Sequence, residues 1–205
     1  MIYEVRTYRL FPRMQPEFIK RFGEAYESRK KHSEMAAFFY TDIGPLNQVI
    51  HVWPYESLEQ RADIRADSVK DGTWPPPVSD LVADQQVEVF HPSPFTPTWN
   101  ASVKGPVYEW RDYILKVGKL QDMYKGWGTA IEARTKMSPL AIAMHTEFGQ
   151  LNRFVHVWAY ESLEQRTQVR REAAAQGVWP PKGPGDHLIT QDNKICYPTA
   201  FSPAQ

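Results

Sequence analysis

Hydrophobic and polar side chains alternate along residues 2–10, a segment rich in Ile, Val, Thr and Tyr. A period of two predicts a β-strand whose side chains point alternately to two faces. The next segment, residues 14–32, carries Phe18, Phe22 and Tyr26 at helical spacing. That spacing places the three rings on one side of a helix. The pattern therefore predicts a strand followed by an amphipathic helix.

Four more elements complete the pattern. Segments 35–43 and 47–53 are rich in β-forming residues and flank a Gly-Pro-Leu turn, which predicts a hairpin. Ser57 and Gln60 have the spacing of a capping box, and Gly72 marks the end of the helix that they begin. A last strand then gives the order β-α-β-β-α-β. This order predicts an antiparallel sheet with helices on one face only.

The whole order occurs twice. Residues 3–76 align with residues 108–181 without a gap, and about 32 of the roughly 74 aligned pairs are identical. We therefore predict two units of one fold, over residues 1–95 and 106–205. The stretch between them, residues 96–105, lies in a Pro-rich segment that cannot continue a helix and suits an extended linker.

The two faces of each predicted sheet differ in chemistry. Ile50 and Val52 give one face of a hairpin strand an apolar character, as do Val155 and Val157 in the second unit. We expect these faces to lie under the helices. The opposite faces are polar and aromatic, and surfaces of this size need cover. The sequence thus predicts an α+β protein of two ferredoxin-like units whose sheets pack face to face as an α/β barrel.

The predicted barrel interior holds a cluster that repeats once per unit. It comprises Glu4, Arg6, Tyr8, Asn47, His51 and Trp53, together with Glu109, Arg111, Tyr113, Asn152, His156 and Trp158. Imidazole titrates near neutral pH, so His51 and His156 are the candidate catalytic bases. The other members are candidate ligand-binding residues, because arginine holds anions and the rings supply apolar walls. The alternative is a buried polar network that fixes packing, with Glu4 paired to an arginine.

A second repeated set consists of arginines. It comprises Arg29, Arg61 and Arg65 in the first unit and Arg134, Arg166 and Arg170 in the second. Arg61 and Arg65 are neighbours on one helical face, where two guanidinium groups could clamp a carboxylate or phosphate. We favour the alternative of ion pairs with acids of the sheet and helix ends, because arginine stems commonly cover apolar surface.

The composition of the chain argues against several classes of binding partner. Lys and Arg together number 24, as do Asp and Glu, so no overall charge favours nucleic acid or an anionic membrane. No apolar run is long enough to insert in a membrane. The single cysteine, Cys196, excludes an intrachain disulfide, and a reducing, cytoplasmic location is expected.

Three motifs resemble the NIPSNAP family. They are the strand Tyr3–Tyr8, the hairpin Thr41–Trp53 and the helix start Tyr55–Arg61, and together with their repeats they span nearly the whole chain. The second unit departs from the pattern at Trp110, Asp112 and Arg153. The resemblance implies a ferredoxin-like fold of the dimeric α/β-barrel superfamily. It also implies relatives that are linked mainly to protein interaction and organelle quality control. Proteins that share the same barrel include small monooxygenases and haem-handling enzymes.

Known cofactor signals are absent from the sequence. There is no Gly-rich phosphate loop, nucleophile elbow or Cys/His metal spacing. His51, His156 or His145 could ligate haem, but no haem motif accompanies them, so we expect neither metal nor cofactor.

We therefore predict that the chain binds a small, partly anionic organic molecule inside the barrel. Any reaction would be cofactor-independent proton transfer or oxygen chemistry. The alternative is a non-catalytic protein-interaction module with a structural polar interior. The sequence leaves open the ligand, whether the chain is an enzyme, and whether chains pair as homo-oligomers. Pocket volume separates the two functions, because a filled barrel favours the interaction module.

Overall fold

The computed structural model of the chain describes residues 1–70, 72, 74–97 and 104–205. Residues 98–103 of the predicted linker lie outside the described residues. Each unit has the predicted order of elements. The first unit comprises β1 (Ile2–Leu10), α1 (Gln15–Arg29), β2 (Ala37–Ile43), β3 (Gln48–Tyr55), α2 (Leu58–Lys70), a short 3-10 helix (Ser79–Leu81) and β4 (Val82–Pro92).

The second unit repeats this order with one difference. It comprises β5 (Val107–Leu115), α3 (Leu120–Gly128), α4 (Ile131–Thr135), β6 (Leu140–Phe148), β7 (Arg153–Tyr160), α5 (Leu163–Ala175), a second 3-10 helix (Pro184–His187) and β8 (Leu188–Pro198). The counterpart of α1 is thus divided into α3 and α4, and the break follows Gly128. Gly128 has a counterpart in Gly23 of the unbroken α1, but the second unit also has Gly126 where the first has Arg21, and two glycines disfavour a helix interior more than one.

Among the described residues, eight strands form one closed barrel in the order β1-β3-β2-β8-β5-β7-β6-β4. Each unit supplies four adjacent strands, and every neighbouring pair is antiparallel. The units join at two seams, where β2 pairs with β8 and β4 pairs with β6. The barrel therefore has no free strand edge, and each unit is completed by the other.

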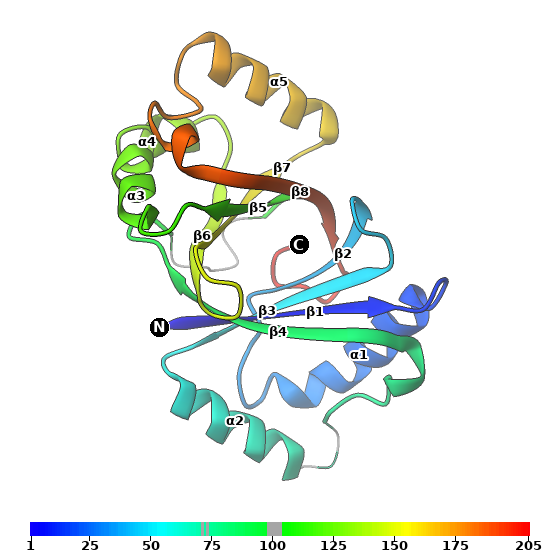
Figure 1. Ribbon diagram of the computed structural model, residues 1–205. Helices are drawn as coiled ribbons and strands as arrows, with labels where there is room; N and C mark the ends of the chain where they lie inside the picture. The colour runs from blue at the N-terminus through cyan, green and yellow to red at the C-terminus, as the bar shows by residue number, and fades with distance from the viewer. Residues whose placement is uncertain (71, 73, 98–103) are drawn as a thin grey trace.

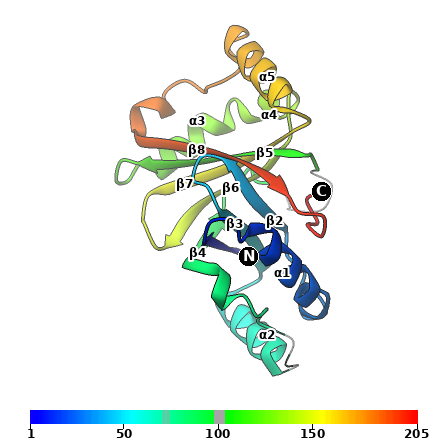
Figure 2. The ribbon, with the colours of Figure 1, turned by 90° about the vertical axis from the view of Figure 1, so that its right-hand side faces the viewer.

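The helices lie outside the barrel on two opposite sides. Figures 1 and 2 show α1 and α2 beside the strands of the first unit and α3, α4 and α5 beside those of the second. The capping box was predicted correctly, since the backbone N–H of Gln60 donates to the Ser57 hydroxyl at 3.2 Å. The equivalent bond joins Gln165 to Ser162 at 3.0 Å.

The barrel interior is a packed apolar core, which corrects the predicted assignment of the faces. Val5, Ile50, Val52, Val155 and Val157 belong to one buried cluster with residues of all eight strands. The faces expected under the helices therefore point into the barrel. Conversely, the predicted interior residues Tyr8 and Trp53 pack with α1, and Tyr113 and Trp158 pack with α3, in two separate outer cores.

The error has a physical cause. The interior of a small closed barrel is sealed from water and must be filled by side chains, so apolar residues are favoured there. The polar faces lie under helices whose own arginines neutralise their carboxylates. Both faces of β1, β3, β5 and β7 are therefore largely buried, and polarity alone did not indicate which face looks inward.

Candidate functional site

Each unit has one buried carboxylate at the centre of the polar sheet face. The Glu109 side chain is fully buried in β5. Arg111 donates to it at 2.9 Å, Arg166 donates to the same oxygen, and Arg170 approaches the other oxygen at 3.5 Å. Burial by itself would raise the pKa of Glu109, but these cations outweigh it and the pKa is lowered. Three guanidinium groups thus face a single carboxylate.

The first unit repeats the arrangement around Glu4. Arg6 donates to its carboxylate at 3.2 Å, Arg61 donates to the second oxygen, and Arg65 lies at 3.8 Å. Arg61 and Arg65 come from α2, so the helix is attached to the sheet by ion pairs. This confirms the predicted pairing of these arginines with an acid of the sheet. Each unit thus places three arginines around one buried glutamate.

The tyrosines are held by the same arginines. Arg111 Nε donates to the Tyr113 hydroxyl at 2.7 Å, and Arg6 Nε donates to Tyr8 at 2.8 Å. A phenol that accepts one bond still has its own O–H to donate. Burial raises the pKa of Tyr113 despite the nearby Arg111 charge, so this hydroxyl keeps its proton at neutral pH.

The histidines lie beneath the helices. His51 is 1% exposed, and its ring contacts Phe22 of α1 at 4.9 Å between centroids. Its Nδ1 accepts from Trp53 Nε1 at 2.6 Å, and the equivalent bond from Trp158 to His156 measures 2.7 Å. The Nδ1 atoms are thus acceptors, and the neutral rings carry their proton on Nε2, which has no hydrogen-bond partner among the described residues.

These surroundings oppose a role as bases. Burial, with the charges of nearby arginines, holds the pKa of His51 and that of His156 well below the usual value. The ring nitrogen that could take a proton is already bonded to an indole. Aromatic rings also separate both imidazoles from the clefts described below. The catalytic role of the two histidines stays a prediction, and the geometry gives it no support.

The remaining predicted residues have structural surroundings. Arg29 is buried, lies over the Trp53 ring at 4.5 Å and donates to Tyr55 at 3.0 Å. Arg134 repeats this over Trp158 at 4.1 Å and donates to Tyr160 at 3.0 Å.

Asn47 and Asn152 occupy the ends of the hairpin turns. Both have φ of +57°, a conformation that asparagine tolerates better than most residues. The carbonyl of Asn47 accepts from Leu10 N at 2.8 Å, and that of Asn152 accepts from Leu115 N at 2.8 Å. Their repetition is thus explained by the turn.

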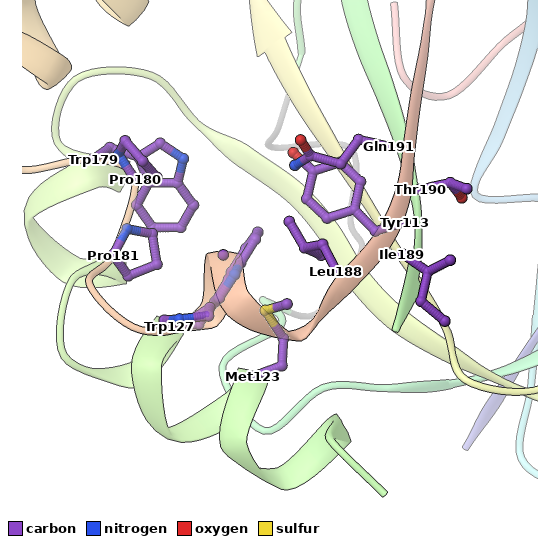
Figure 3. Close-up of a pocket in the computed structure, with 12 residues that line it drawn as sticks. Tyr113, Met123, Trp127, Trp179, Pro180, Pro181, Leu188, Ile189, Thr190 and Gln191 are labelled. Atoms are coloured by element: carbon purple, nitrogen blue, oxygen red, sulfur yellow. The ribbon is translucent and has the colours of Figure 1, made fainter. Parts of the chain in front are cut away.

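A cleft of about 530 Å³ opens between α3 and the outer face of the second unit. Figure 3 shows Trp179, Pro180 and Pro181 on one side and Tyr113 with Gln191 on the other, with Leu188 between them. Its walls present both apolar and polar surface, and Tyr113, Thr190 and Gln191 supply polar groups; the lining also includes Met123, Trp127, Pro184, Gly185 and Ile189. Trp127 and Trp179 meet edge to face at 4.7 Å.

The first unit has a smaller cleft in the equivalent place. Its volume is about 280 Å³, and Tyr8, Phe22 and Trp74 stand where the second unit has Tyr113, Trp127 and Trp179. Arg6 and Arg65 line it directly. Of the predicted site residues, Tyr113 lines the cleft of the second unit, and Tyr8 and Arg6 line that of the first, as does Arg65 of the arginine set. The Trp-Pro-Pro turns were missed as site residues, although their repetition in the sequence was a signal.

A profile of the NIPSNAP family matches residues 3–97 and 108–203, once in each unit. The chain belongs to the NIPSNAP family. It is 30% identical to mouse Protein NipSnap homolog 3B over 98% of this chain and 85% of that protein. It is 28% identical to human Protein NipSnap homolog 3A over 99% of this chain and 85% of that one.

Two solved structures are also similar to parts or all of this chain. A NIPSNAP family protein of unknown function from Agrobacterium tumefaciens is 34% identical, covering 47% of this chain and 92% of that chain, with a TM-score of 0.45. A candidate monooxygenase from Lactobacillus acidophilus covers 96% of this chain and 93% of that chain at 12% identity, with a TM-score of 0.65. The latter likeness concerns the fold alone. Within the described part of the chain, no helix has the length and apolar character needed to cross a membrane.

Proposed function

We propose that this NIPSNAP protein binds a small planar organic molecule with an anionic oxygen in the cleft of the second unit. The observation that carries the proposal is the Tyr113 hydroxyl on the cleft wall, which accepts from Arg111 at 2.7 Å. Its remaining donor can point to a ligand oxygen, with the Arg111 charge behind it. Trp127 and Trp179 offer flat apolar surfaces to the body of the ligand.

This proposal moves the predicted site from the barrel interior to its outside. The interior is filled by the protein's own side chains. Because no ligand-sized space among the described residues supports binding inside the barrel, the filled interior favours a structural role there, as in the predicted non-catalytic interaction module. The outer cleft supports ligand binding instead, and we propose binding without assigning a reaction. The cytoplasmic location and any pairing of chains stay predictions.

The experiment uses 2-naphthoate as a planar aromatic carboxylate and follows its binding to the full chain by titration calorimetry. Tyr113→Phe removes the donor and keeps the ring, so we expect binding to weaken about 5- to 30-fold. Tyr8→Phe makes the same change in the first unit and should leave this binding within about twofold.

Trp179→Leu tests the apolar wall and should also weaken binding. Equal affinities for the unaltered protein, Tyr113→Phe and Trp179→Leu would contradict the proposed site. Native mass spectrometry of the purified chain then searches for a co-purified molecule. Such a molecule should leave when Trp179 is replaced, provided that circular dichroism shows an intact fold.

A further inference from the structure

Among the described residues, the otherwise apolar barrel interior contains one ionic cluster, and this cluster joins the two units. Arg153 Nε donates to Asp112 at 2.7 Å, a second nitrogen donates to the same carboxylate, and the third donates to Glu88. Glu88 is 4% exposed and belongs to β4 of the first unit, whereas Arg153 and Asp112 belong to the second. Lys194 of β8 lies over the Trp110 ring at 5.6 Å.

The strand register identifies which positions correspond. Glu88 pairs with Val5, and Lys194 pairs with Trp110, the repeat partner of Val5. Glu88 and Lys194 are therefore equivalent positions with opposite charges. Arg153 likewise stands where the first unit has Gln48, and Asp112 stands where it has Thr7.

Each of the two equivalent positions lies under the hairpin turn of the other unit. A Cβ added to Gly149 would lie 3.4 Å from the Glu88 carboxylate, and one added to Gly44 would lie 2.9 Å from Lys194 Cβ. The side chain at position 88 thus lies against the hairpin of the second unit, which carries position 153. The side chain at position 194 lies against the hairpin of the first unit, which carries position 48.

The charges differ among the three ways of pairing units. The observed pair brings Glu88 to Arg153. Its charged residues that point inward and are not exposed are two acids, Glu88 and Asp112, and two bases, Arg153 and Lys194. Two first units would bury two Glu88 carboxylates with Gln48 as their neighbour. Two second units would bring Lys194 to Arg153 twice. Unpaired or like charges are costly in a low-dielectric interior. Arg9, Asp84 and Asp192 continue the same strand faces but are exposed to water.

We infer that this ionic cluster determines which units pair. It favours a barrel closed by the first and second units of the chain and disfavours a barrel closed by two copies of the same unit. The attractive element is Glu88 with Arg153, and the repulsive element is Lys194 with Arg153. The departures at Asp112 and Arg153 thus adapt the second unit to its partner. The inference does not depend on the proposed ligand site.

The test places a protease site within residues 98–103 of the full chain, cleaves the folded protein, and unfolds and refolds the two pieces together. Native mass spectrometry then counts the three pairings. We expect the mixed pair to exceed the sum of the like pairs by about tenfold or more. Random pairing would give about equal amounts, because half of all random pairs are mixed, and would overturn the inference.

The triple variant Asp112→Thr, Arg153→Gln and Lys194→Glu gives the second unit the residues of the first. We expect it to pair at random. A matched control changes the same charges on exposed residues, through Glu172→Thr, Arg171→Gln and Lys182→Glu, and should keep the mixed pair. A triple variant that still forms only mixed pairs would overturn the inference.

A second measurement covers the case in which the triple variant does not refold. In the uncleaved chain, Glu88→Arg and Arg153→Glu should each lower the melting temperature, and the double variant should recover part of the loss. If the double variant loses as much melting temperature as the two single variants together, or more, the two residues are not coupled and the inference is overturned.

Discussion

His51 and His156 lie in surroundings that keep an imidazole uncharged. Each ring is covered by aromatic side chains, and each accepts from a tryptophan two residues away. Glutamine could accept the same bond but would not fill the same aromatic contacts. We therefore attribute the repetition of these residues to packing and hydrogen bonding, and the attribution has a consequence for the pH dependence of stability.

The first prediction concerns the free energy of unfolding below about pH 6.5, the usual pKa of histidine. There the unfolded chain takes up two protons, whereas the folded chain does not, because both folded pKa values are lowered. The stabilisation is complete above this pH and is lost as the pH falls toward the folded values. Two groups contribute up to about 2.7 kcal/mol per pH unit.

Urea unfolding between about pH 5 and 7.5 measures this slope. His51→Gln with His156→Gln should be less stable at neutral pH, should lack the contribution of these two groups, and should still bind 2-naphthoate. A double variant with unchanged stability and lost binding or turnover would instead favour the catalytic role predicted from the sequence.

The second prediction concerns the left-handed turn residues. Asn47→Ala and Asn152→Ala should each lower the free energy of unfolding by about 1 kcal/mol, because alanine at positive φ brings Cβ too close to a carbonyl oxygen. Asn47→Gly and Asn152→Gly are the controls and should cost less, since glycine has no Cβ. Chemical denaturation measures all four variants. Equal losses for alanine and glycine would point to the amide group instead of the backbone.

At the scale of elements, α2 and α5 are attached to the barrel by ion pairs together with a few apolar contacts. Both helices present arginines to a buried glutamate. Ile64 of α2 packs against the outer core and α5 buries Val169 and Ala173, whereas Leu58, Val69 and Leu163 remain exposed. Helix α1 differs, because Phe18 and Phe22 anchor it in the outer core. The attachment of α5 should therefore depend on Glu109.

The third prediction is that Glu109→Gln loosens α5 selectively. The change leaves three guanidinium groups facing a neutral amide, and we expect a loss of about 2–4 kcal/mol, less than for a fully buried pair because the arginines reach water. Hydrogen exchange should accelerate in Leu163–Ala175 and not in Leu58–Lys70. Glu4→Gln should reverse this pattern. Uniform acceleration in both helices would show that neither glutamate acts on its own helix.

At the scale of the whole molecule, the two units share one interior. Each seam pairs strands from different units, and rings stack across both, Tyr40 on Tyr197 and His91 on His145. The interior cluster contains residues from every strand. Neither unit can therefore lose its structure without exposing the core of the other.

The fourth prediction is a single unfolding transition. Phe39→Ala creates a cavity in the barrel interior and should cost about 3–5 kcal/mol. Because the interior is shared, the change should lower the melting temperature of both units together, as measured by calorimetry and by hydrogen exchange in β5 and β7. Ile43→Ala on the exposed end of β2 is the control and should have little effect. Two separate transitions would contradict a shared core.

The sequence by itself determined the repeat, the order of the elements and the family, because these depend on local periodicity and on residues that recur at fixed spacing. For Arg61 and Arg65 it favoured ion pairs with an acid over a clamp for an anion, and the structure decided between the two. The division of α1's counterpart into α3 and α4 was not predicted, since a continuous helical pattern outweighed the glycines in that segment.

Tertiary structure alone decided which face of each strand looks inward. A strand presents its two faces at equal spacing, and in β1, β3, β5 and β7 both are largely buried, so alternation cannot separate them. The decision came from the hydrogen-bonded seams that close the barrel and from the helical arginines that neutralise Glu4 and Glu109 outside it. The cleft likewise depends on contacts between Trp127 and Trp179, which the chain separates by many residues and only the fold brings together.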